Sequence, residues 1–196
     1  LNAAVRRLKF EEFFFLNLAN LSQKAVNKQK NRSNPFPNIG HYFNTFYTEH
    51  LPFELTGAQK RVIKEIRTDL RQPAQMNRLL QGDVGSGKTM VALLTMLIAI
   101  DNGYQAALIA PTEILAIQHY ESIKELLNDL DVSVELLTGS VSKKKRQPIL
   151  ENLANGELKI IIGTHALLED NVQFHNLGLS IIDEQHRFGV AQRAKF

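Results

Sequence analysis

Apolar and polar positions along this chain form short apolar runs separated by segments of helical period. The apolar runs predict strands at residues 79–81, 106–110, 132–137, 159–162 and 179–182, and the other segments predict helices at 56–71, 90–100, 112–128 and 142–154. Apolar strands joined by helical crossovers indicate a parallel sheet covered by helices on both faces. From Leu51 onward the chain is therefore predicted to be an α/β domain.

The first fifty residues have a different pattern. Residues 1–31 contain no glycine or proline, and Pro35 and Pro37 follow. Helical spacing gives the first segment a largely aromatic face made of Leu1, Val5, Leu8, Phe14, Phe15, Leu18, Leu21 and Ala25. Such a face packs against something, either the following domain or a neighbour that is missing. We predict a helical connector at 1–33, a linker at 34–50 in which 41–50 is a short connection or a turn of helix, and the main domain at 51–196.

The composition is that of an ordinary soluble globular protein, with 196 residues, 44% hydrophobic and 22% charged. Its longest apolar run, residues 91–100, is too short to cross a bilayer, so no membrane contact is expected. No leader pattern opens the chain, and the absence of cysteine agrees with a cytoplasmic protein. Because Leu1 is not an initiator methionine, we expect that the chain was cut from a longer one.

The net charge of +3 is unevenly distributed. Residues 1–50 contain seven Lys and Arg against three Asp and Glu, and the remaining residues contain sixteen against seventeen. Any contact between the main domain and DNA must therefore depend on local geometry rather than on bulk charge. The basic run at residues 143–146 lies at a predicted helix start, where such runs usually face solvent.

Residues 82–89, Gly-Asp-Val-Gly-Ser-Gly-Lys-Thr, fit the phosphate-binding P-loop pattern G-x-x-x-x-G-K-[ST]. A predicted strand precedes the motif and a predicted helix follows it, so an incidental glycine-rich turn is the weaker interpretation. In such a loop, backbone N–H groups surround phosphate oxygens, Lys88 reaches the β- and γ-phosphates, and the Thr89 hydroxyl holds Mg²⁺. Nucleotide contacts are thus predicted at Gly82, Asp83, Val84, Gly85, Ser86, Gly87, Lys88 and Thr89.

A second candidate site follows the predicted strand at 179–182, where Asp183 and Glu184 begin the next segment. Opposite a P-loop, Asp183 would hold Mg²⁺ directly or through water, and Glu184 would orient and deprotonate the attacking water. Two acids at a strand end can also be the start of a solvated loop. Their combination with the P-loop favours catalysis, because open α/β sheets place their sites at the carboxyl ends of strands.

Together these segments resemble the motifs of helicase superfamily 2, and within it the RecG family of bacterial DNA helicases. The resemblance covers the chain from about residue 1 to its end. It rests on residues 51–59, 82–89, 110–119, 138–140, 163–167 and above all 183–190, D-E-Q-H-R-F-G-V. The Mfd family of transcription-repair coupling factors is similar, but it has D-E-E-Q at the acidic motif and a different residue at the position of Ser86.

The resemblance implies a RecA-like P-loop NTPase fold that uses ATP and Mg²⁺. It places Phe53 and Gln59 at the nucleotide, with Gln59 bound to the adenine edge, whereas Thr56 and Gln59 alone also form a capping box. His186 would couple the ATP site to the DNA site. Contacts to DNA are implied at Pro111, Thr112, Glu113, Thr138, Gly139, Gly163, Thr164 and His165, each of which could instead be a helix-start or turn residue.

We therefore expect the first motor lobe of an ATP-dependent helicase or translocase that acts on branched DNA and stalled replication forks in repair and recombination. Its expected partners are DNA, a second motor lobe that brings an arginine, and a wedge domain. Because the chain stops before the family's motif III, the fragment alone is expected to be largely inactive. A P-loop switch without translocation and a small-molecule kinase stay open. His41, His50, His119 and His175 show no partners for a metal site.

Overall fold

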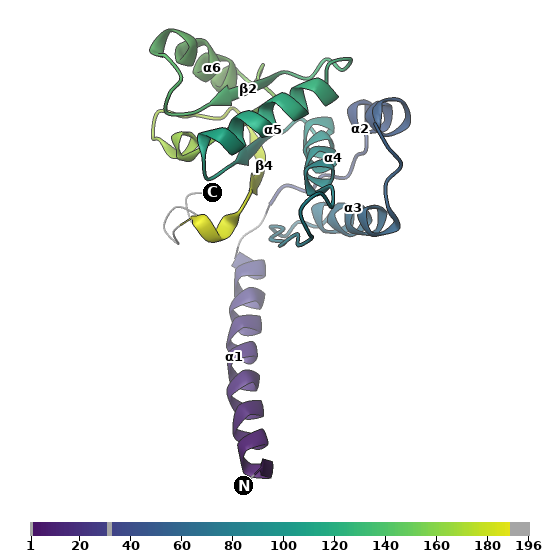
Figure 1. Cartoon of the computed structure of the whole chain (residues 1–196), viewed down its shortest axis with the longest axis vertical. Coiled ribbons are helices and arrows are strands. Elements are labelled where there is room, and N and C mark those ends of the chain that lie inside the picture. Colours follow the sequence, from purple (N-terminus) through teal and green to yellow (C-terminus); the bar gives the residue numbers. More distant parts are fainter. Residues whose placement is uncertain (1, 31–32, 189–196) are drawn as a thin grey trace.

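The structure, a computed structural model, describes residues 2–30 and 33–188 (Figure 1). Its sheet has four parallel strands in the order β2-β3-β1-β4: β1 (Gln105–Ile109), β2 (Val134–Leu137), β3 (Ile160–Gly163) and β4 (Leu177–Ile182). Ile109 of β1 pairs with Gly163 on one side and with Ile182 on the other. The predicted parallel sheet is confirmed, with four of the predicted strands close to their expected bounds.

Helices cover both faces of this sheet, as predicted. They are α3 (Gly57–Leu70), α4 (Lys88–Asp101), α5 (Glu113–Leu126) and α6 (Lys143–Asn155). Alternate residues of β1 enter different cores because strand side chains point to opposite faces. Ala106 and Leu108 join the core formed with α3, α4 and α5, whereas Ala107 and Ile109 join the core that contains Ile149 and Leu153 of α6.

The prediction of a strand at residues 79–81 is wrong, because these residues form no regular secondary structure. Leu79 is 62% exposed, while Leu80 packs partly against the core. A strand is stabilised by a ladder of hydrogen bonds to a neighbour, and local apolar character alone does not provide one. In the described part of the chain, β4 is therefore an edge strand.

Helix α4 explains the long apolar run. Apart from Ala92, residues 90–100 are all buried, as expected of a helix that lies between a sheet and other helices. Asp101 at its end accepts backbone N–H bonds from Gly40 (2.9 Å), Tyr42 (3.0 Å) and Phe43 (3.1 Å). The carboxylate thus caps the start of α2 (His41–Thr45) and attaches it to α4.

Residues 34–50, predicted as a linker, pack against this core. Helix α2 continues into a π-helix at Phe46–His50, and Phe36, Phe43 and Phe46 are buried. Asn38 and Asn102 exchange a pair of hydrogen bonds of 3.0 and 2.9 Å. Of the two predictions for residues 41–50, a short connection or a turn of helix, the helix is the one that forms. The domain boundary at residue 51 stays a prediction.

Helix α1 (Asn2–Lys30) forms as predicted and extends away from the sheet (Figure 1). The described members of its apolar face are exposed: Val5, Leu8, Phe14, Phe15, Leu18 and Leu21. Leu1 and the side chain of Ala25 lie outside the part of the chain that the structure describes. Packing of this face against the following domain, one of two expected possibilities, is therefore not observed. None of the helices in the described part of the chain is long and apolar enough to cross a membrane.

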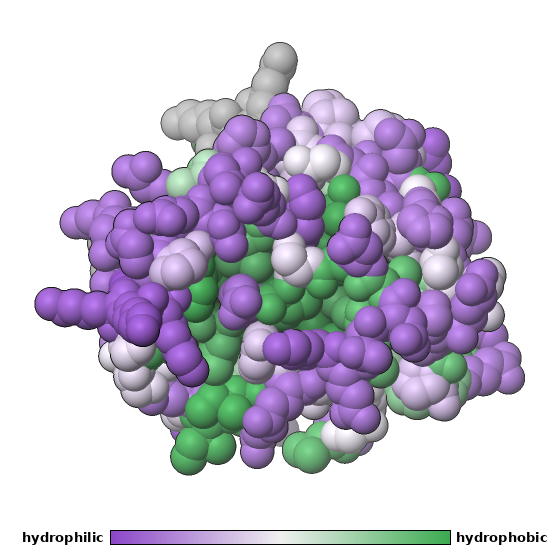
Figure 2. Space-filling view, turned by 90° about the horizontal axis from the view of Figure 1, so that it is seen from above, coloured by the Kyte–Doolittle hydropathy of each residue, from purple (hydrophilic) through white to green (hydrophobic). Residues whose placement is uncertain are grey.

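The end of the molecule opposite α1 also exposes apolar residues. Figure 2 shows them as a band across the middle of that face, bordered by hydrophilic residues. Apolar surface of this kind is common on folded proteins, since there is too little polar surface to cover them completely.

Replacing Asp101 by alanine tests the attachment of α2 to α4. We expect the free energy of unfolding to fall by about 2–3 kcal/mol, because three backbone N–H groups lose a charged acceptor and α2 loses its cap. Urea denaturation measures this change. Asp131→Ala, at an exposed aspartate, is the matched control, and equal midpoints for the two variants would contradict the assigned role.

Candidate functional site

The carboxyl ends of all four strands lie along one edge of the sheet. Backbone hydrogen bonds continue past the strands, from Asp183 N to Ile109 O (2.8 Å), from Ala110 N to Gly163 O (2.8 Å) and from Thr164 N to Leu137 O (3.4 Å). The segments that begin at residues 110, 138, 164 and 183 therefore start side by side. These are the segments to which the sequence assigned function.

Helix α4 brings the P-loop to the same edge. Its C-terminus is joined to the start of β1 by residues 102–104 alone, so that end lies at the amino edge of the sheet. Since α4 packs along β1 and β4, its N-terminus lies toward the carboxyl edge. Lys88 begins α4, so the loop before it faces the segment after β4.

Glycines give the P-loop its shape. Gly85 and Gly87 have φ angles of 77° and 76°, in the left-handed region that favours glycine. A Cβ on Gly82 would lie 2.6 Å from Ser86 Oγ, so a larger residue would disturb the turn. Residues 82–86 are exposed, and α4 begins directly after them, which leaves its first N–H groups available to an anion.

Lys88 folds back over this loop. Its Nζ donates to Gly82 O (2.7 Å) and to Asp83 O (2.8 Å). An ammonium group has three donors, so one remains for another acceptor. Thr89, the predicted Mg²⁺ ligand, is half-buried next to it.

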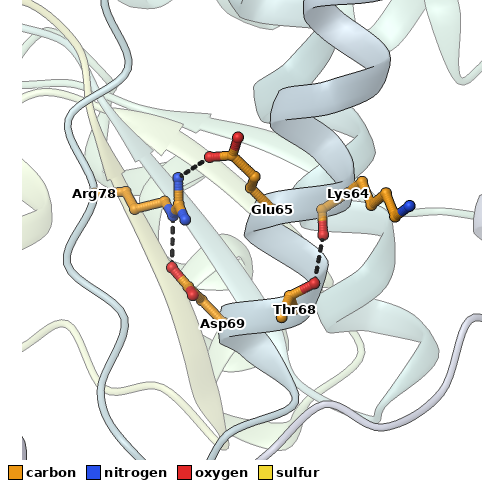
Figure 3. Close-up of polar contacts among 5 residues, drawn as sticks. All are labelled: Lys64, Glu65, Thr68, Asp69 and Arg78. Carbon is orange, nitrogen blue, oxygen red and sulfur yellow. Dashed lines mark hydrogen bonds and ion pairs between the residues drawn. The ribbon is translucent and has the colours of Figure 1, made fainter.

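Arg78 holds the segment that enters the P-loop, a role that the sequence did not reveal. Its guanidinium donates to Glu65 (2.8 Å) and to Asp69 (2.5 Å), both on α3 (Figure 3). The two acceptors lie one turn apart on the helix and match the fork of donors on arginine. In the same view the side chain of Lys64 points away from Arg78, and the Thr68 hydroxyl donates to the backbone carbonyl of Lys64 (2.9 Å) (Figure 3).

Gln59 fulfils the capping box and also contacts the P-loop. Its Oε1 accepts from Thr56 N (2.8 Å), and its backbone N–H donates to Thr56 Oγ1 (3.2 Å). Its Nε2 donates to Ser86 O (3.0 Å), and the side chain is 8% exposed. Both ends of the amide are thus engaged by the protein, and the contact of Gln59 with an adenine edge stays a prediction. Phe53, assigned to the nucleotide with it, is 49% exposed.

Asp183 is a half-buried carboxylate at the end of β4. Its Oδ2 lies 2.8 Å from His119 Nε2, and its Oδ1 accepts from Glu184 N (2.9 Å). The hydrogen bond from His119 is the main cause that lowers the pKa of Asp183, against an upward effect of burial. The charge of Lys88 also lowers this pKa, so the P-loop lysine and Asp183 lie within electrostatic reach of each other.

Glu184 has an unusual backbone. With φ and ψ both at 48°, it is the one described non-glycine residue in the left-handed region, which costs on the order of 1 kcal/mol or more. Its Oε2 lies 3.4 Å from His186 Nδ1, and both side chains are largely exposed. Strain of this kind gathers at functional sites, and the catalytic role of Glu184 stays a prediction.

The residues assigned to DNA differ in accessibility. Thr112, Gly139 and His165 are exposed, Pro111 and Glu113 are half-buried, and Thr138, Gly163 and Thr164 are buried. Glu113 Oε1 accepts from Ser140 N (3.1 Å) and thereby joins the start of α5 to the turn at 138–140.

The buried members of this set have structural environments. A Cβ on Gly163 would lie 2.1 Å from Leu137 O, so strand pairing alone requires glycine there. The Thr138 hydroxyl contacts that of Ser140 (2.9 Å). The Thr164 hydroxyl is buried without a hydrogen-bond partner among the described residues. In the basic run, residues 143–145 are exposed and Arg146 pairs with Glu169 (2.6 Å).

His119, to which the sequence assigned no site, contacts Asp183. The signal that could have revealed it is its place on α5: it lies between Ala116 and Ile123, which are both buried, at helical spacing. This face of α5 lies against the sheet. A histidine there, close to the carboxyl edge, can therefore form hydrogen bonds mainly with residues that directly follow a strand. His50, by contrast, lies 3.9 Å from Asp129.

The donor set suits a nucleotide with Mg²⁺. The described residues contain no group of three or more His, Cys, Asp or Glu side chains that could hold a metal alone. Mg²⁺ characteristically uses one or two protein oxygens together with phosphates and water, and Thr89 and Asp183 can provide these oxygens. The positive-φ glycines and Lys88 provide the complementary surface for phosphates.

Comparison with known proteins agrees with this geometry. The chain is 52% identical to the ATP-dependent DNA helicase RecG of Synechocystis sp. over 195 residues, and 48% identical to that of Bacillus subtilis over 199 residues; each alignment covers all of this chain. These alignments cover 23% and 28% of the relatives, so the chain spans about a quarter of their length.

A solved structure of RecG bound to a three-way DNA junction is also similar. The TM-score is 0.84 at 45% identity, over 94% of this chain and 25% of that one. This likeness confirms the RecA-like fold that the resemblance implied. The model of the DEAD/DEAH box helicase family matches residues 56–196. The P-loop, the acidic pair and this match lead to one conclusion: the chain belongs to the DEAD/DEAH box helicase family.

Proposed function

We propose that this chain is part of a longer ATP-dependent DNA helicase of the RecG type, which acts on branched DNA and stalled replication forks in repair and recombination. In that protein it forms the ATP-binding first motor lobe. The observation that carries the proposal is geometric: the P-loop before α4 and Asp183 after β4 lie at the same edge of the sheet. The RecG relatives favour this type over an Mfd-like translocase.

ATP and Mg²⁺ are the proposed cofactors. Lys88 and the N–H groups of the P-loop hold the phosphates, Thr89 and Asp183 hold the metal directly or through water, and Glu184 orients and deprotonates the attacking water. Bound Mg²⁺ neutralises the charge that develops on the transferred phosphoryl group. Gln59 binds the adenine edge with Phe53 nearby. His186, 3.4 Å from Glu184, links the water-orienting carboxylate to the DNA-binding side.

DNA is the proposed macromolecular partner, since a relative of this chain was solved on a three-way junction. Within this lobe exposed Thr112, Gly139 and His165 reach phosphate by side chain or backbone N–H, next to half-buried Pro111 and Glu113. Thr138, Gly163 and Thr164, which are buried, support the same loops from below the surface. A second motor lobe and a wedge domain of the same protein complete the machinery. We place the protein in the cytoplasm, where such DNA-acting enzymes work.

Replacing Lys88 by alanine in the full-length protein tests the P-loop assignment. Affinity for a fluorescent ATP analogue should fall about 10- to 100-fold, because a charged hydrogen bond to phosphate contributes about 1.5–3 kcal/mol. Unwinding of forked DNA should be lost with it. Lys64→Ala is the control, since Lys64 is an exposed lysine on α3, and equal affinities for the two variants would contradict the assignment.

Replacing Glu184 by glutamine separates catalysis from binding. The amide keeps the size of the side chain but cannot accept the proton of water, so ATP turnover should fall by about 10²–10⁴. Nucleotide affinity should stay within a few-fold of the original. Steady-state phosphate release and equilibrium titration measure the two quantities. If phosphate release by the variant stays close to that of the original protein, Glu184 is not the catalytic base.

The isolated lobe should turn over ATP far more slowly than the full-length protein. An arginine supplied by another part of a motor contributes about 10³–10⁵ in rate where arginine fingers act. Phosphate release by residues 1–196, with and without forked DNA, measures this. DNA-stimulated turnover comparable to that of the full-length protein would overturn this expectation.

A further inference from the structure

The contact between His119 and Asp183 joins two elements that are distant in sequence. His119 lies on α5, Asp183 follows β4, and His119 Nε2 is 2.8 Å from Asp183 Oδ2. The side chains are 18% and 29% exposed, respectively. Both side chains are thus shielded from bulk water. A hydrogen bond to a charged group is stronger in such a shielded place than on an open surface.

The position of His119 is fixed by the packing of α5. This helix packs against β2 and β3, with Ala116 and Ile123 fully buried on the same side as His119. Its first turn is also anchored, because the Thr112 hydroxyl accepts from Leu115 N (3.3 Å). The imidazole is therefore presented to Asp183 by a helix that has little freedom to move at that turn.

Both oxygens of Asp183 are oriented by the protein. Oδ2 accepts from His119, and Oδ1 accepts from the backbone N–H of Glu184 at 2.9 Å. A carboxylate oxygen has two lone pairs, so each oxygen keeps capacity for a metal or a metal-bound water. Groups that orient a metal-binding carboxylate in this way typically change metal affinity about 10- to 100-fold when they are removed.

We propose that His119 is a positioning residue that orients the Asp183 carboxylate for the divalent cation of the bound nucleotide. The proposal rests on the proposed function of Asp183 as a metal-binding residue. His119 acts as a hydrogen-bond donor through Nε2 and does not itself bind the metal or the nucleotide. Its removal leaves the carboxylate held through Oδ1 alone, by the N–H of Glu184, so the cation is held less tightly while the P-loop contacts to phosphate remain.

The test compares nucleotide binding with and without metal in the full-length protein. A fluorescent ATP analogue is titrated at increasing Mg²⁺, and again in the presence of a chelator. For His119→Ala we expect the Mg²⁺ concentration at half-maximal binding to rise about 10- to 100-fold, with metal-free binding unchanged. His119→Gln, whose amide can donate in place of Nε2, should restore the Mg²⁺ requirement to within a few-fold.

Two control variants separate the role of His119 from that of Asp183. His50→Ala removes another histidine close to an aspartate, Asp129, and should leave both titrations unchanged. If Asp183→Asn leaves the Mg²⁺ requirement unchanged, the proposed function of Asp183 fails. If Asp183→Asn raises that requirement and His119→Ala does not, the positioning role alone fails.

Three further results would also overturn the positioning role. They are tighter Mg²⁺ binding in His119→Ala, an equal loss of metal-free and metal-dependent binding, and failure of His119→Gln to restore the requirement. If His119→Ala does not fold, as judged by thermal unfolding, the comparison of His119→Gln with the shorter His119→Asn decides. The glutamine should retain Mg²⁺ binding and the asparagine should lose it, and equal behaviour of the two would contradict the proposal.

Discussion

Parallel pairing of β1 with β4 is the constraint on which the site depends. It extends beyond the strands, since Asp183 N still donates to Ile109 O at 2.8 Å. This bond places Asp183 beside the segment that starts α5, and from α5 His119 reaches its carboxylate. The pairing of β3 with β1 and of β2 with β3 orders the segments after β2 and β3 along that edge. A change of register by one residue would turn each side chain of β4 to the opposite face and remove Asp183 from its partners.

The P-loop reaches this edge by a different route. Helix α4 lies buried along the sheet, and its end is attached through Asp101 to the start of α2. At its other end, Gln59 bonds to Ser86, and Arg78 ties the entering segment to α3. Side chains from α3 therefore hold the loop on two sides. These contacts leave the glycine backbone exposed for phosphate while they limit its movement.

Much of the fold and of the site could be predicted from the sequence. The P-loop and the acidic pair are local patterns. The rule that parallel strands end at one edge places the acidic pair, whereas the P-loop reaches that edge through the packing of α4 along the sheet. The segment at 79–81 could not be predicted correctly, because its pairing depends on a neighbour and not on its own apolar residues. The same holds for His119 and Asp183, which are 64 residues apart. Gln59 shows a third case, since one side chain serves both the helix cap and the loop.

If Lys88 and Asp183 bind one nucleotide with its Mg²⁺, a crystal structure of the full-length protein with Mg²⁺ and a non-hydrolysable ATP analogue will show both at the same ligand. We expect the triphosphate to be surrounded by residues 82–88, with the cation between the Thr89 hydroxyl and Asp183, directly or through one water. A nucleotide bound elsewhere, or a cation with no link to Asp183, would contradict it.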